Sequence, residues 1–90
     1  MATVLLIIKI MPKSPESNLD SIKKSAQSLM ETEGAKSISF EEKPIAFGLN
    51  AIFMKFVLPE EKGTDIVEQK LSSINEVSSI NIEDYRRAFG

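Results

Sequence analysis

The sequence predicts a small α+β domain, and three observations lead to this class. Its 90 residues are enough for one domain with a modest core, so we expect a single domain over residues 1–90. The fractions of apolar (42%) and charged (27%) residues are those of a folded globular protein. Segments with strand and helix periodicity alternate in the order strand–helix–strand–strand–helix–strand.

The first half of the chain is expected to contain two strands and a helix. Residues 3–11 are rich in leucine and β-branched residues and are largely apolar on both faces, which predicts a strand. After a loop with two prolines, Asn18 is a good N-cap for a helix over residues 19–32, and Gly34 is placed to end it. Residues 36–43 alternate between apolar and polar, as in an edge strand with one wet face.

The second half is expected to have the same order of elements, strand–helix–strand. Residues 49–58 form an expected third strand, again largely apolar on both faces. Thr64 is expected to cap a second helix that ends near residue 74. Residues 77–84 alternate as a fourth strand, and residues 85–90 are expected to be a tail.

This order of elements is that of the ferredoxin-like split βαβ arrangement, a four-stranded antiparallel sheet with two helices on one face. In it the first and third strands are central, which agrees with the two strands that are apolar on both faces. The other sheet face should be open. Apolar side chains on this face would form a patch. Such patches often mark a contact with another protein, although the tail could also cover this one. Its members are expected to be Leu5, Ile7, Ala51, Phe53 and Val57.

The composition narrows the possible chemistry. Cysteine and histidine are both absent, which removes thiol nucleophiles, disulfides, the usual zinc ligands and the commonest general base. No glycine-rich phosphate loop is present. We therefore expect no enzyme activity, no cofactor and no metal site. The net charge of −2 argues against a general nucleic-acid binder. The apolar run at residues 4–8 is too short for a membrane span, so a cytoplasmic protein is expected.

Three residues stand out as candidates for binding. Phe47 precedes Gly48 in the loop before the third strand, where it could instead plug the core or anchor the loop. Arg86 and Arg87 follow the last strand, where they could instead be a solvated tail. Aromatic and arginine side chains dominate the hot spots of protein interfaces, and a cation near a chain end suits a partner's phosphate or metal site.

An RNA- or ribosome-associated binding module is the alternative. That function requires aromatic side chains on the open sheet face for base stacking. Phe53 is the only good candidate there, and its neighbours are expected to be aliphatic, without a basic surround. A regulatory domain that binds a metabolite would leave little trace in the sequence, so this third class also stays open.

Several stretches resemble a known family. They are residues 8–12 leading to 17–19, the run Pro-Ile-Ala-Phe-Gly-Leu at 44–49, and residues 77–87. Over essentially its whole length the chain resembles the archaeal translation elongation factor 1-beta family, and it is similar to the C-terminal exchange domain of the eukaryotic factor. The run at 44–49 is the most specific part.

The resemblance implies the ferredoxin-like fold and guanine nucleotide exchange on elongation factor 1-alpha, in its GDP-bound and nucleotide-free forms. It implies that Phe47 inserts into the GTPase, next to Gly48. It also implies that Arg87, with Arg86 adjacent, takes the place of a basic residue that disturbs the magnesium and phosphate site, where the eukaryotic form has lysine. No bond chemistry is involved. A monomer is expected, without direct nucleic-acid or membrane partners.

Overall fold

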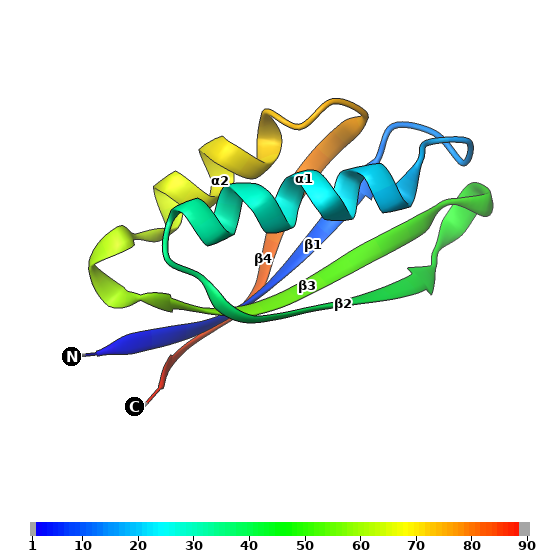
Figure 1. Ribbon diagram of the computed structural model, residues 1–90. Coiled ribbons are helices and arrows are strands. Elements are labelled where there is room, and N and C mark those ends of the chain that lie inside the picture. The colour runs from blue at the N-terminus through cyan, green and yellow to red at the C-terminus, as the bar shows by residue number, and fades with distance from the viewer. Residues whose placement is uncertain (1, 89–90) are drawn as a thin grey trace.

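The computed structural model describes residues 2–88 and has two layers, a four-stranded antiparallel sheet and two helices on one of its faces (Figure 1). The strands are ordered β2-β3-β1-β4, so the predicted fold class and the predicted central strands are confirmed. The elements are β1 (Thr3–Pro12), α1 (Leu19–Thr32), β2 (Lys36–Pro44), the 3₁₀ turn η1 (Ala46–Gly48), β3 (Asn50–Pro59), the 3₁₀ turn η2 (Glu60–Lys62), α2 (Thr64–Ser72) and β4 (Val77–Ala88).

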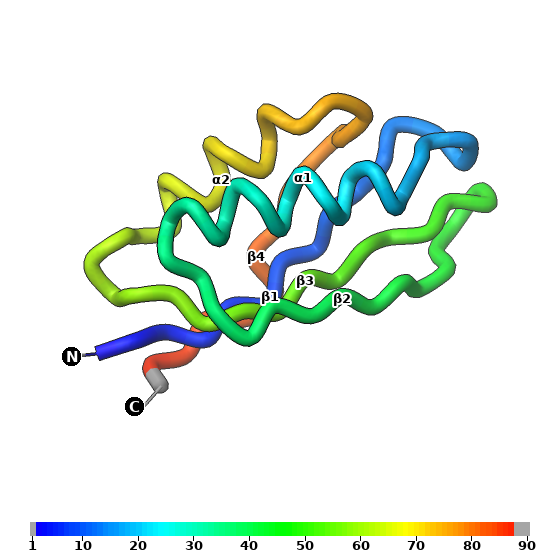
Figure 2. The backbone as a smooth tube through the Cα atoms, in the orientation of Figure 1, coloured from blue at the N-terminus to red at the C-terminus, as the bar shows by residue number. Residues whose placement is uncertain are grey.

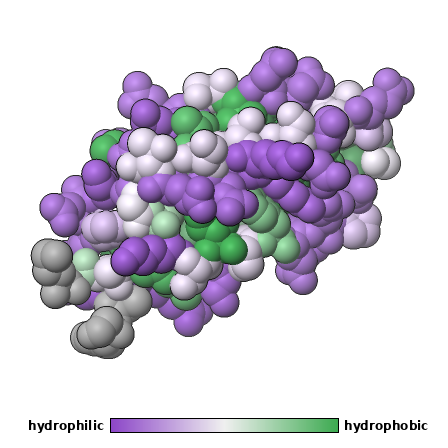
Figure 3. All heavy atoms as spheres, in the orientation of Figure 1, coloured by the Kyte–Doolittle hydropathy of each residue, from purple (hydrophilic) through white to green (hydrophobic). Residues whose placement is uncertain are grey.

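One hydrophobic core lies between the sheet and the helices. Side chains alternate across a strand, so every second residue of the central strands points toward α1 and α2. Phe56 is the largest of the fully buried side chains. The core residues of the central strands and helices are Val4, Leu6, Ile8, Ile10, Ile52, Met54, Phe56, Leu58, Ile22, Ala26, Met30, Val67 and Leu71. Hydrophilic side chains cover most of the surface seen in Figure 3.

The predicted N-cap of α1 is confirmed, whereas the predicted N-cap of α2 is wrong. The Asn18 side chain accepts a hydrogen bond from the Ser21 amide (3.0 Å), as an N-cap does, and Gly34 follows α1 with a φ of 94°. The expected cap at Thr64 is wrong, because Thr64 is the first residue within α2. Gly63 precedes it with φ 75° and ψ 157°, a backbone conformation that is essentially reserved for glycine.

The predicted tail is also wrong where it covers residues 85–88, because β4 continues through Ala88. In this stretch Tyr85 lies opposite Leu6, and Arg87 lies opposite Val4 near the start of β1. The first residues of β1 have backbone groups that need a partner on this side, and the ladder supplies it whatever the side chains are. Phe89 and Gly90, the rest of the expected tail, lie outside the described residues.

The open sheet face is largely as expected. Leu5, Ile7, Phe53 and Val57 lie on it and are half-buried. Ala51 lies opposite Lys43 and is fully buried, although it is not part of the main core. No helix among residues 2–88 is both long and apolar enough to span a membrane.

Candidate partner-binding site

The loop between β2 and β3 presents Phe47 to solvent. Two backbone hydrogen bonds close this loop, from the Ile45 amide to the Leu49 carbonyl (2.8 Å) and from the Leu49 amide to the Ala46 carbonyl (3.3 Å). Phe47 is 93% exposed. It therefore neither plugs the core nor anchors the loop, and the two alternatives to a binding role are excluded.

The backbone at Phe47 is strained as well. Its φ of 62° and ψ of 30° lie in the left-handed region, which costs a residue with a Cβ atom about 1–2 kcal/mol. Gly48 follows with a φ of 74°, where glycine is not penalised. A bulky aromatic that is strained and exposed contributes nothing to folding, and such residues concentrate where ligands or partners bind.

A β-bulge determines where the two arginines point. Ile82 lies opposite Ile8, but Asp84 lies opposite Ile7, so Glu83 is an extra residue in β4. Such a residue shifts the alternation of all later side chains by one. Arg87 therefore lies on the helix side of the sheet, and Arg86 lies on the open face. Without the bulge the two would be exchanged.

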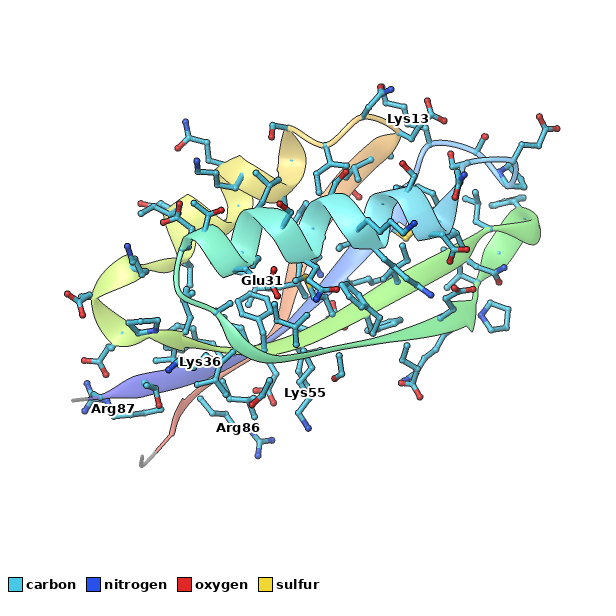
Figure 4. All side chains as sticks on the ribbon, in the orientation of Figure 1. Lys13, Glu31, Lys36, Lys55, Arg86 and Arg87 are labelled. Carbon is cyan, nitrogen blue, oxygen red and sulfur yellow. The ribbon has the colours of Figure 1, made fainter. Side chains whose placement is uncertain are left out.

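Each arginine has a carboxylate partner. Arg87 Nε donates to Glu60 Oε2 (2.6 Å), which comes from η2, and Arg86 Nε lies 2.9 Å from Asp84 Oδ2. The arginine side chains are 66% and 73% exposed, so each pair contributes at most about 1 kcal/mol. Figure 4 shows Arg87 beside the start of β1 and Arg86 on the side away from the helices. The pairing of Glu60, 27 residues away in the chain, had no signal in the sequence.

The structure does not bring Phe47 and Arg87 together. Arg87 and Leu58 both lie level with Val4, whereas the Phe47 loop precedes Asn50 at the other end of β3. Eight residues of strand separate Asn50 from Leu58, or about 26 Å at roughly 3.3 Å per residue. Figure 2 shows the β2–β3 turn at one end of the molecule, and the start of β1 and the end of β4 at the other; the molecule is 41 Å long. The candidate site thus consists of two separate contact points.

The expectation that Phe53 lacks basic neighbours is wrong. Lys43 Nζ lies 4.8 Å from the centroid of its ring, and Lys9 lies directly opposite on β1. Both neighbours come from other strands, so their proximity depends on the register and not on the local sequence. The ring is nevertheless a poor stacking platform, because the Lys43 ammonium group lies over it.

Within residues 2–88, no group of three or more His, Cys, Asp or Glu side chains could hold a metal ion. Phe47 is the most exposed large apolar side chain of the described residues, and Arg86 and Arg87 lie at the opposite end of the sheet. An exposed aromatic ring and exposed guanidinium groups suit a protein partner. The fold and these groups describe a small binding domain.

Comparisons with known proteins identify the kind of binding domain. The family model of the EF-1 guanine nucleotide exchange domain matches residues 5–88. Elongation factor 1-beta of Methanothermobacter thermautotrophicus is 41% identical over 88 residues, which cover 97% of this chain and 98% of that protein. Elongation factor 1-beta of Haloarcula marismortui is 35% identical over 88 residues (97% and 99%). The chain belongs to the EF-1 guanine nucleotide exchange domain family.

A solved structure supports the fold alone. LarC2, the C-terminal domain of a cyclometallase involved in the synthesis of the NPN cofactor of lactate racemase, superposes with a TM-score of 0.67 at 11% identity. The match covers 99% of this chain and 58% of that chain.

The family assignment confirms both the resemblance and the predicted function as a guanine nucleotide exchange factor of translation elongation. The individual roles of Phe47, Gly48, Arg86 and Arg87 stay predictions.

Proposed function

We propose that this chain accelerates GDP release from elongation factor 1-alpha by contacting it at two separated points, the Phe47 loop and the Arg87 end of β4. The observation that carries the proposal is the exposed aromatic on a left-handed backbone, which has no role in the fold. The separation of about 26 Å along β3 suits a partner that offers two sites, such as a nucleotide domain and a second domain.

The Phe47 contact supplies affinity. Burial of a phenylalanine side chain in a partner's pocket contributes roughly 1.5–3 kcal/mol. The closed loop already holds the ring in place, so binding requires little further ordering. Gly48 supports this arrangement because its positive φ lets the chain turn toward β3, which begins two residues later.

The Arg87 contact acts on the nucleotide. Its guanidinium group is a planar fork that matches phosphate oxygens, and among the described residues an exposed carboxylate, that of Glu60, holds it. A phosphate or a carboxylate of the magnesium site can replace Glu60 at little cost. Because the fork is not a compact ammonium group, contact with these oxygens is favoured over direct replacement of the magnesium ion.

The exchange itself follows from linkage. If the factor binds the nucleotide-free GTPase more tightly than the GDP-bound form, it weakens the affinity for GDP by the same ratio, tenfold for each 1.4 kcal/mol of coupling. GDP then leaves and GTP refills the site. One copy of the chain carries both contacts, and neither a membrane nor a nucleic acid takes part. The proposed location is the cytoplasm.

Release of a fluorescent GDP analogue from purified elongation factor 1-alpha tests the proposal. The wild type should accelerate release, and Phe47→Ala and Arg87→Ala should each reduce that acceleration by roughly 10- to 100-fold, the range of a lost hot spot. Phe47→Trp keeps a large aromatic and should retain most activity. Circular dichroism verifies that each variant is folded. No acceleration by the wild type would exclude the function, and full activity of both alanine variants would exclude the site.

A further inference from the structure

The open sheet face carries an excess of positive charge, although the whole chain has a net charge of −2. Cross-strand partners point to the same face, so the register assigns its charged residues. Arg86 lies opposite Leu5, Lys36 opposite Val57 and Lys9 opposite Phe53. The five cations of this face are Lys9, Lys36, Lys43, Lys55 and Arg86, and its three carboxylates are Glu41, Glu83 and Asp84.

Three of these cations have no carboxylate partner. Lys43 pairs with Glu41 (3.5 Å) and Arg86 with Asp84 (2.9 Å), but no ion pair involving Lys9, Lys36 or Lys55 occurs within residues 2–88. Lys55 is exposed near the middle of the face, and Figure 4 shows it projecting from the sheet away from the helices. On the helix side, by contrast, Lys62 and Lys70 both pair with Glu33.

The centre of the face is aliphatic. Leu5, Ile7 and Val57 are half-buried there, and a shallow groove of about 360 Å³ runs beside Ile7, Phe53 and Lys55. An aliphatic centre with unpaired lysines around it fits an acidic protein surface that also offers apolar side chains. A second copy of the chain would bring like charges together. RNA would need a free aromatic ring, and Lys43 covers that of Phe53.

We infer that the open sheet face is the side of the domain that lies along the GTPase, and that Lys55 contacts an acidic surface of it between the two end contacts. This inference rests on the proposed function. A partner that contacts both ends of the sheet bridges the surface between them, which includes the two broad faces of the domain. The open face is the one that combines an aliphatic centre with three lysines that have no ion pair among the described residues.

Two charge reversals test which face is turned to the partner. Lys55→Glu changes the open face, and Lys24→Glu makes the same change at an exposed lysine of α1 that has no ion pair among the described residues. The Kd for nucleotide-free elongation factor 1-alpha is measured by titration calorimetry for each. Lys55→Glu should weaken binding about tenfold at roughly 0.05 M salt and less than about threefold at roughly 0.5 M. Lys24→Glu should change it less than about twofold.

Every other outcome overturns the inference. A larger effect of Lys24→Glu would show that the helix face is turned to the partner. Equal effects, or none, would show that only the two ends are in contact with it. Binding of single-stranded poly(U) by the wild type that is lost in Lys55→Glu would assign the face to RNA. The proposed function fails separately, when the wild type does not accelerate GDP release.

Discussion

Replacement of Phe47 by glycine should stabilise the fold while it removes the contact with the partner. The left-handed backbone at this position costs phenylalanine about 1–2 kcal/mol, and glycine adopts it freely. Because the side chain is 93% exposed, its loss removes almost no buried surface. The greater freedom of glycine in the unfolded chain opposes the gain by about 0.5–1 kcal/mol. A net stabilisation of about 0.5–1 kcal/mol remains.

Thermal unfolding followed by circular dichroism measures this effect. For a domain of this size, 1 kcal/mol shifts Tm by about 4–8 °C, so Phe47→Gly should raise Tm by about 2–8 °C. Phe47→Ala is the matched control, because it loses the same ring but keeps a Cβ atom and the strain. Its Tm should stay within about 2 °C of the wild type. Both variants should lose exchange activity to the same extent.

The comparison of these two variants can refute the reasoning. A glycine variant that is less stable than the alanine variant would show that the backbone at position 47 is not strained in solution. An alanine variant that is several degrees less stable than the wild type would show that the ring packs against the protein after all.

Three further predictions concern the fold and the loop. Asn18→Ala should cost about 1 kcal/mol in urea unfolding because it removes the N-cap of α1, whereas Thr64→Ala should cost less than about 0.5 kcal/mol because Thr64 caps nothing. Phe56→Ala should cost about 3–5 kcal/mol in the same assay, since its ring is fully buried. Gly48→Ala meets no atom within 4 Å but strains a φ of 74°, so it should remain folded, move Phe47 and slow GDP release.

The fold could be predicted because the relevant signals are local. Residues 3–11 and 49–58 are apolar on both faces, which identified them as central strands before any pairing was known. Asn18 and Gly34 marked the ends of α1 for the same reason, because caps act within a few residues. The prediction at Thr64 was wrong because Gly63, in a conformation reserved for glycine, and not the Thr64 hydroxyl, determines the turn into α2.

The site could be predicted only in part. Phe47 was identified by its residue type and its glycine neighbour, but its positive φ is imposed by the way the loop closes. The pair of Glu60 with Arg87 had no signal in the sequence, and neither did the lack of ion pairs at Lys9, Lys36 and Lys55 within residues 2–88. Strand register and chain reversals determine the neighbours of these side chains. The bulge at Glu83 follows from the pairing of β4 with β1 and has no glycine to mark it.

A final prediction follows from that bulge, because it determines which face of the sheet each of two adjacent arginines lies on, and the sequence could not distinguish their roles. Arg87 lies beside Glu60 on the helix side, whereas Arg86 lies on the open face. GDP release titrated with the factor should show that Arg87→Ala lowers the maximal rate about 10- to 100-fold. Arg86→Ala should instead raise the half-maximal concentration by about three- to tenfold, and less at high salt, as expected for an exposed interface charge. Both variants should stay within about 1 kcal/mol of wild-type stability, because their ion pairs are exposed. If both lower the same kinetic parameter equally, the two sides of the strand do not have separate roles.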